Sequence, residues 1–291
     1  MRTLVKRFPY MANKSFNLYP IGDIHLGSAG CDEELLEKTV KQIASDPDGR
    51  VVLMGDMIDG IGRANGDKRN RNKTLATWAR QVEDEDELFE AEVAKAVEVL
   101  SPIADKLLAV VCGNHEDDVE RHGHGNVYWQ IVDRLAVIGG HKAQDIALGY
   151  DGFIPIRFDR QVKDNKPHVW TLTLFVHHGF GGGKMPGAKA LNLWHMLGTY
   201  DADIVLVGHT HDHVYTEREI VSPGNGTPKQ KTRVGVVCGS FLKGYIEPSK
   251  RGRPREMYSE RFGMPVLRTG HPVITIDPGR EKFSVTHHIG G

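Results

Sequence analysis

Five short hydrophobic runs in this chain each end at a polar motif, and this arrangement constrains the fold more than any other feature. The runs are Leu18–Ile21, Val51–Met54, Leu107–Cys112, Leu172–Val176 and Ile204–Val207. Apolar runs of this length predict buried strands. The motifs that follow them are Asp23-Ile24-His25, Gly55-Asp56, Gly113-Asn114-His115-Glu116, His178-Gly179 and Gly208-His209-Thr210-His211. Because open α/β folds place their sites at the carboxyl ends of strands, we expect the motifs to converge on one sheet edge.

Segments with helical spacing of apolar residues separate these runs, and more strands follow in the second half. The expected helices are Asp32–Ala44, Glu83–Leu100, Val127–Ile138 and Pro186–Leu197. The further expected strands are Phe153–Phe158, His168–Val176, Val214–Ile220, Arg233–Cys238 and Val273–Ile276. Asp32 is suited to cap the first helix, and Pro186 fits a first helical turn. This order predicts one α/β domain over residues 1–291, with two packed sheets flanked by helices.

Composition and charge narrow the class of protein. The chain has 291 residues, of which 40% are hydrophobic and 26% charged, which suits one large domain with a sizeable core. A formal net charge of -1 gives no global attraction to nucleic acid or to an anionic membrane, so such contacts must come from local patches. No apolar stretch approaches the roughly 20 residues of a membrane span, and no secretion signal is visible. Three widely spaced cysteines argue against a disulfide framework, so we expect a cytoplasmic protein.

The polar motifs contain more metal-binding side chains than one ion needs. Asp23 and His25 point to the same side if the backbone stays extended, and so do His209 and His211. The seven candidate ligands are Asp23, His25, Asp56, Asn114, His178, His209 and His211. This number exceeds the needs of one four-coordinate zinc and suits two cations that share a bridging carboxylate. The mixture of imidazole and carboxylate favours a divalent transition metal, with Mn²⁺ expected first and Fe, Zn, Co or Ni as alternatives.

Two such cations favour chemistry at phosphorus. Held about 3.5–4 Å apart, two cations clamp the attacking and leaving oxygens of a phosphoryl group and lower the pKa of a bound water. The sequence therefore predicts hydrolysis of a phosphate ester by attack of metal-bound hydroxide. A lone Asp or His at a strand end is usually a cap or a surface residue, but five motifs together make that interpretation a poor one.

The motifs also carry a family resemblance. The pattern D-x-H, G-D-x-x-D, G-N-H-[D/E], H and G-H-x-H is matched in order and spacing from residue 23 to residue 211. In this respect the chain resembles the calcineurin-like metallophosphoesterase superfamily. The resemblance implies an α/β fold in the form of a four-layer α/β/β/α sandwich, with two mixed sheets flanked by helices and two metals at the sheet edge.

The resemblance also implies roles for individual residues. Metal one takes Asp23, His25, Asp56 and His211. Metal two takes Asp56, Asn114, His178 and His209. His177 precedes His178, but the family's fourth histidine is often followed by glycine, which points to His178.

Two further residues have catalytic roles by the same resemblance. His115 is then the general acid or transition-state stabiliser near the leaving oxygen rather than a ligand. Asp59 orients His115 through a hydrogen bond and raises its pKa. The alternative for Asp59 is a loop cap.

Two loops bear on the choice of ester. The segment from Gly60 to Lys73 is basic and contains Arg63, Arg69 and Arg71, and Lys184 follows the His178 strand. These side chains are candidate contacts to further phosphates of DNA or RNA. The alternative is a solvated surface loop. A second basic segment, Lys243 to Arg255, is a candidate to widen the same groove.

Departures from particular branches of the superfamily shape the functional hypothesis. Ser/Thr phosphatases carry arginine where this chain has Gly60, which weakens that assignment. The start at Gly22–Gly27 resembles the double-strand-break repair nucleases, although no capping domain of theirs is evident. We therefore expect a phosphodiesterase acting on nucleic acid or a nucleotide, as a nuclease does. A phosphomonoesterase is the alternative, and a non-catalytic scaffold is disfavoured because every candidate ligand is retained.

Overall fold

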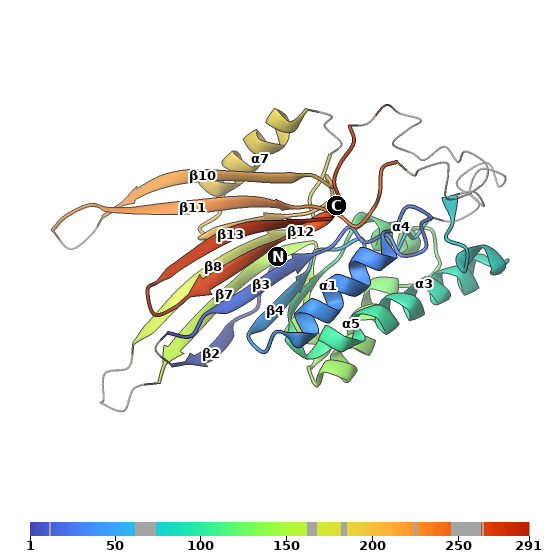
Figure 1. Cartoon of the computed structure of the whole chain (residues 1–291), viewed down its shortest axis with the longest axis horizontal. Helices are drawn as coiled ribbons and strands as arrows, with labels where there is room; N and C mark the ends of the chain where they lie inside the picture. Colours follow the sequence, from blue (N-terminus) through green and yellow to red (C-terminus); the bar gives the residue numbers. More distant parts are fainter. Residues whose placement is uncertain are drawn as a thin grey trace.

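Two mixed β-sheets pack face to face and carry helices on their outer faces (Figure 1). The computed structural model describes residues 1–11, 13–61, 74–161, 168–181, 185–223, 226–245, 263 and 265–290. In this part of the chain the first sheet contains β1 (Arg2–Thr3), β2 (Lys6–Tyr10), β7 (Asp151–Arg160), β8 (Val169–His177), β9 (Ile204–Val207), β10 (His213–Ser222) and β11 (Lys229–Cys238). The second contains β3 (Phe16–Ile21), β4 (Gly49–Leu53), β5 (Leu107–Val111), β6 (Ala147–Gly149), β12 (Gly270–Asp277) and β13 (Lys282–Ile289).

Strand direction decides where the motifs meet. In the second sheet the order is β13-β12-β3-β4-β5-β6, and β3, β4, β5 and β6 run parallel. In the first sheet the order is β1-β7-β8-β9-β11-β10, with β2 also paired to β7, and β8, β9 and β11 run parallel. Each predicted hydrophobic run coincides with one of these parallel strands to within a few residues. The motifs therefore leave both sheets at the carboxyl ends of β3, β4, β5, β8 and β9.

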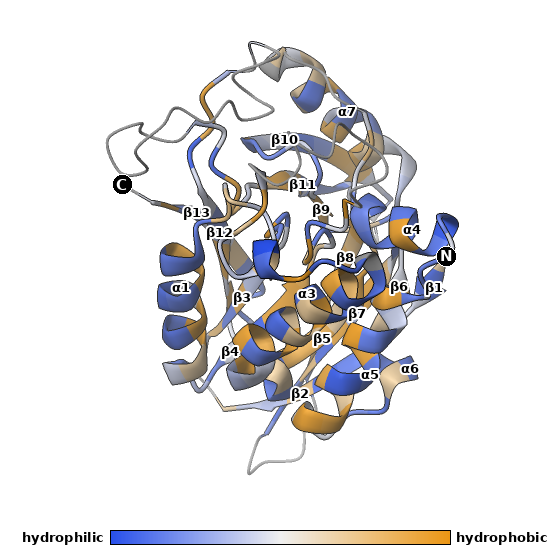
Figure 2. Ribbon diagram, turned by 90° about the vertical axis from the view of Figure 1, so that its right-hand side faces the viewer, coloured by the Kyte–Doolittle hydropathy of each residue, from blue (hydrophilic) through white to orange (hydrophobic). Residues whose placement is uncertain are grey.

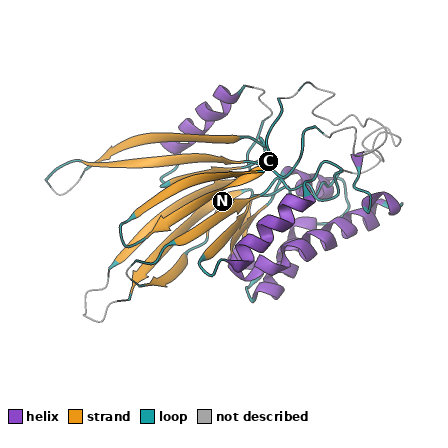
Figure 3. Cartoon of the chain, viewed as in Figure 1, coloured by secondary structure: helices purple, strands orange, loops and turns teal. Residues whose placement is uncertain are grey.

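The helices complete the layers (Figure 3). They are α1 (Glu33–Ser45), α3 (Glu85–Leu100), α4 (Asn114–Arg121), α5 (Val127–Gly139), α6 (Ala143–Ile146) and α7 (Pro186–Thr199), with the 3-10 helices η2 (Ala79–Gln81) and η3 (Ser101–Lys106). The four longest of these correspond to the four predicted helices. No helix in the described ranges is long and apolar enough to cross a membrane.

Local chemistry explains the helix ends. The Asp32 side chain accepts a hydrogen bond from the Leu35 amide, as its predicted capping role requires. Helix α1 buries Leu36, Val40 and Ile43 on one face, so its ribbon in Figure 2 alternates between hydrophilic and hydrophobic colours. Gly140 ends α5 in a left-handed conformation with φ of 70°, which glycine adopts without steric cost.

Three hydrophobic clusters fill the spaces between the layers. The central cluster joins side chains such as Val52 of β4 and Leu206 of β9, and it lies between the two sheets. The largest cluster packs α1, α3 and α5 against the outer face of the second sheet, with Leu53 as one member. A smaller cluster packs Leu193 and Leu197 of α7 against the outer face of the first sheet. This arrangement confirms the predicted four-layer α/β/β/α sandwich.

Candidate metal centre

The candidate ligands lie in loops just beyond the strands, in an unusual backbone conformation. Asp23, His25, Asp56, His209 and His211 have φ values of 47°, 53°, 50°, 66° and 55°. Positive φ is uncommon for residues other than glycine, and it persists where the surrounding structure holds it in place, often at functional sites. The condition stated above for Asp-x-His and His-x-His, an extended backbone, is therefore not met. The strands end two residues earlier, and left-handed turns bring the side chains together.

Main-chain hydrogen bonds hold two of these loops against each other. The Asp23 amide donates to the Gly55 carbonyl at 2.9 Å, and the His25 amide donates to the Asp56 carbonyl at 3.0 Å. The buried Ser240 hydroxyl donates to the Asp23 carbonyl at 2.8 Å. Sequence reasoning did not identify Ser240, because a serine after a strand carries no local signal of a contact to residue 23.

Gly55 has to be glycine for two separate reasons. Its φ is +93°, and a Cβ built there would lie 2.6 Å from His178 Nδ1 and 2.7 Å from the Gly113 amide nitrogen. Real Cβ atoms do not approach other atoms this closely, so a side chain would displace His178 or the Gly113 loop. The close contact at Gly55 is thus a contact between protein segments.

The first group of ligand-type atoms comes from β3 and β9. Asp23, His25 and His211 each offer an atom within 4.8 Å of the others. His25 Nε2 lies 3.1 Å from His211 Nε2, and His211 Nε2 lies 3.4 Å from Asp23 Oδ1. Burial lowers the pKa of His25 well below its ordinary value, and the neighbouring His115 and His211 lower it further. Neutral imidazole is the form that binds metal.

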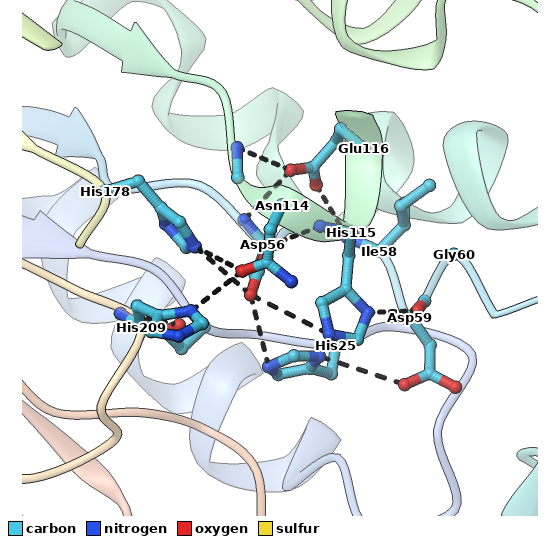
Figure 4. Close-up of polar contacts among 12 residues, drawn as sticks. His25, Asp56, Ile58, Asp59, Gly60, Asn114, His115, Glu116, His178 and His209 are labelled. Atoms are coloured by element: carbon cyan, nitrogen blue, oxygen red, sulfur yellow. Dashed lines mark hydrogen bonds and ion pairs between the residues drawn. The ribbon is translucent and has the colours of Figure 1, made fainter. Parts of the chain in front are cut away.

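The second group comes from β4, β5, β8 and β9 and surrounds Asp56 (Figure 4). His178 Nε2 lies 3.3 Å from Asp56 Oδ2 and 3.0 Å from Asn114 Oδ1. His209 Nδ1 lies 2.8 Å from the same Asn114 oxygen. Asp56 Oδ2 also lies 3.9 Å from His25 Nε2, so this carboxylate faces both groups.

The structure places His178 rather than His177 beside Asp56. His178 is fully buried, and its Nδ1 lies 2.8 Å from the Met54 carbonyl, so Nδ1 carries the proton and Nε2 faces the centre. Burial opposes a charge on this ring, but the Asp56 carboxylate outweighs it and raises the pKa of His178 to about 10, so a metal ion at Nε2 would displace a proton. His177 is the last residue of β8, and its Nδ1 accepts a hydrogen bond from the Gly179 amide at 2.7 Å.

The contact between Asp59 and His115 differs from the expected one. His115 Nδ1 donates to the main-chain carbonyl of Asp59, while the Asp59 carboxylate Oδ1 lies 3.8 Å from His25 Nδ1. The predicted dyad is thus corrected in one respect, since the hydrogen-bond acceptor is the peptide oxygen. The reason is that the loop turns at Gly60, whose φ is +54°, and this turn aims the carbonyl at His115.

The surroundings of His115 favour its charged form. Burial alone lowers its pKa, but the carboxylates of Asp56 and Asp59 and the carbonyl acceptor produce a net raised pKa. Its Nε2 lies 4.0 Å from Asp56 Oδ2. The ring therefore presents Nε2 toward the candidate metal ligands.

Glu116 organises the loop that carries Asp56. One carboxylate oxygen accepts from the amides of Met57 and Ile58 at 2.7 and 3.2 Å, and the other accepts from Asp56 and Gly113 at 3.0 and 2.8 Å. Burial and the Asp56 charge raise the pKa of this carboxylate, and the amide donors oppose that rise. Glu92 of α3 has a similar position, since its Oε2 accepts from the Gly60 amide at 2.8 Å. Sequence reasoning did not identify Glu92.

Replacing Glu116 with Gln is expected to weaken metal binding about 10- to 100-fold, the usual cost of losing a group that orients ligands. A carboxamide places an NH₂ group against two of the four amide donors, which also lowers the free energy of unfolding by about 1–3 kcal/mol. Metal titration and urea unfolding would measure both effects. Glu120→Gln is the matched control, because Glu120 is exposed on the same helix. Unchanged metal affinity in Glu116→Gln would contradict the ordering role.

The structure does not place every predicted residue. Arg63, Arg69, Arg71 and Lys184 lie outside the described residues, so their contacts to substrate stay predictions. Of the second basic segment, Lys243 is described, and its Nζ lies 2.8 Å from Asp32 Oδ2 at the start of α1.

A family model and two solved structures relate this chain to known proteins. Among curated proteins none matches the chain. Among solved structures it is similar to a conserved uncharacterized protein from Streptococcus pneumoniae, titled a predicted phosphoesterase, at 11% identity over 96% of this chain and 100% of that chain, with a TM-score of 0.32. It is also similar to the NAD nucleotidase of Haemophilus influenzae at 11% identity, over 95% of this chain and 50% of that chain, with a TM-score of 0.40. A family model for calcineurin-like phosphoesterases matches residues 17–213, so the chain belongs to the calcineurin-like phosphoesterase family.

Proposed function

We propose that this chain is a phosphodiesterase that hydrolyses a nucleic acid or a nucleotide at a binuclear metal centre. Membership of the calcineurin-like phosphoesterase family makes it a metal-dependent phosphoric ester hydrolase, and the family depends on two metal ions. The observation that carries the proposal is the position of Asp56. Its carboxylate faces two groups of ligand-type atoms, each of which combines residues that follow strands of both sheets.

The residues fit a pair of divalent transition metals. Imidazole nitrogens, carboxylate oxygens and an amide oxygen converge without a thiolate, which suits Mn²⁺ first, with Fe, Zn, Co and Ni as alternatives. Asp23, His25, Asp56 and His211 would hold one ion. Asp56, Asn114, His178 and His209 would hold the other. When bound, two such ions neutralise charge on the phosphoryl oxygens and activate a water.

His115 is the residue best placed to move a proton. Its Nδ1–H is bound to the Asp59 carbonyl, which fixes the ring orientation. Its pKa is raised by the Asp56 and Asp59 carboxylates, and Nε2 is the ring atom that would donate a proton to the leaving oxygen. Asp59 positions the ring through its peptide oxygen. The buried Glu92 carboxylate, bound to the next amide, supports that peptide.

The choice of a diester over a monoester is supported by Gly60. A side chain is excluded at this position, since a Cβ there would lie 2.8 Å from the His115 carbonyl oxygen and φ is +54°. The guanidinium that Ser/Thr phosphatases carry at this point is therefore missing. A monoester dianion needs more positive charge around it than a diester monoanion does. A phosphomonoesterase is the second candidate, and a non-catalytic scaffold is the third.

The test is hydrolysis of bis-p-nitrophenyl phosphate and of p-nitrophenyl phosphate with added Mn²⁺. We expect a higher kcat/KM for the diester in the wild type and a loss of at least about 100-fold toward both esters in Asp56→Asn. A preference for the monoester would replace the proposal with a phosphatase. Inactivity with every divalent transition metal would favour the scaffold.

A further inference from the structure

A pocket of about 110 Å³ lies beside the candidate metal centre, on the α7 side of the first sheet. Gly179 of its wall directly follows His178, and Thr210 lies between His209 and His211. Consecutive Cα atoms are about 3.8 Å apart. The Cα atoms of these two wall residues therefore lie that close to the Cα atoms of the candidate ligands His178, His209 and His211. The pocket and the metal centre therefore share the same two loops.

The topology places this pocket at the functional edge of the sheet. Helix α7 connects β8 to β9, which run parallel, so α7 begins at the carboxyl edge and crosses back over the sheet (Figure 1). Its first turns contribute Ala188, Lys189 and Asn192 to the pocket. A crevice at the carboxyl ends of parallel strands is where open α/β folds bind ligands.

The lining suits an uncharged flat group. Leu193, Met196, Val207 and Val237 provide apolar walls. Phe180 also lines the pocket, and this residue is 66% exposed. That ring lies edge-on to the ring of His177, with the centroids 5.9 Å apart.

The polar groups of the pocket favour hydrogen bonding over charge pairing. Asn192 is an exposed residue and adds a side-chain amide to the lining. Lys189 Nζ lies 3.3 Å from Asp212 Oδ2 and donates to the Thr210 carbonyl at 3.2 Å, so its charge is already compensated. The pocket thus offers no uncompensated lysine to a second phosphate among the described residues.

We infer that this pocket binds the nucleobase of the substrate while the phosphate lies at the metal centre. The inference rests on the proposed function and names the substrate class more closely. A base has an apolar π face for Phe180 and a polar edge for the Asn192 amide. Stacking of a base on an aromatic side chain tolerates all bases, so the pocket recognises nucleotides without strict sequence preference.

The test compares two diesters that share one leaving group. Thymidine 5′-(p-nitrophenyl phosphate) carries a base, and methyl p-nitrophenyl phosphate does not. Phe180→Ala is expected to raise KM for the thymidine ester about tenfold, the usual effect of removing a base-stacking ring. The methyl ester should change less than about twofold by the same reasoning. Trp194→Ala is the matched control, because Trp194 is an exposed aromatic residue of α7 outside the pocket lining.

An equal loss on both esters, or no loss on either, would overturn the nucleobase pocket. If the wild type hydrolyses neither diester, the proposed function fails, and binding then decides the inference separately. Calorimetry with Mn²⁺ would compare thymidine 5′-phosphate with methyl phosphate. Tighter binding of the nucleotide that is lost in Phe180→Ala and reduced in Asn192→Ala would support the pocket. Equal affinities in the wild type would refute it.

Discussion

Asp56→Asn is expected to lower kcat/KM for a phosphodiester by at least about 100-fold, because loss of even a supporting residue behind a ligand can cost that much. One Asp56 oxygen lies 3.3 Å from His178 Nε2 and 3.9 Å from His25 Nε2. The other accepts the His115 amide at 3.0 Å. Asparagine keeps the size of the side chain but removes the charge and one acceptor oxygen. Both groups of ligands therefore lose a shared anion.

The metal content of Asp56→Asn distinguishes the loss of a metal ligand from a general disturbance of the fold. Elemental analysis after dialysis should show less than the wild-type metal content in Asp56→Asn, with the circular dichroism spectrum unchanged. Asp133→Asn is the matched control, since Asp133 is exposed on α5. Retention of full activity and full metal content in Asp56→Asn would show that this carboxylate does not link the two groups.

His115→Ala is expected to lower kcat about 10²- to 10⁴-fold, the usual contribution of a positioned general acid. The His115 ring is bound through Nδ1 to the Asp59 carbonyl and is not one of the seven candidate ligands. Removing the ring therefore removes a proton donor and leaves those ligands in place. The loss should be larger for an alkyl leaving group than for p-nitrophenolate, which departs without a proton. Steady-state kinetics on both kinds of diester would measure the difference.

Metal analysis again decides between two roles for His115. His25, Asp56 and His115 also offer atoms within 4.8 Å of one another, so a ligand role has a geometric basis. Metal loss in His115→Ala would establish that role and contradict proton donation. His122→Ala is the control, since His122 lies at the end of the same helix with its ring exposed.

Local sequence signals were sufficient for the elements that carry the centre. Continuous apolar runs predicted β3, β4, β5, β8 and β9, because strands covered on both faces need apolar side chains at every position. Helix α1 was predictable from its Asp32 cap and the spacing of Leu36, Val40 and Ile43. The same signals were too weak for β13, an edge strand whose residues alternate between partly exposed and exposed. They also missed α4, which is short and mostly polar.

The motifs by themselves determined which side chains meet, since parallel strands bring their carboxyl ends to one edge. How those side chains are held was decided only by the tertiary structure. Ser240 supports Asp23, Glu116 binds the Asp56 loop and Glu92 binds Gly60, each across many residues of chain. The left-handed turns and the Asp59 carbonyl at His115 depend on these contacts. Conformations that are unfavourable for an isolated residue are stable here because distant segments supply the compensating hydrogen bonds.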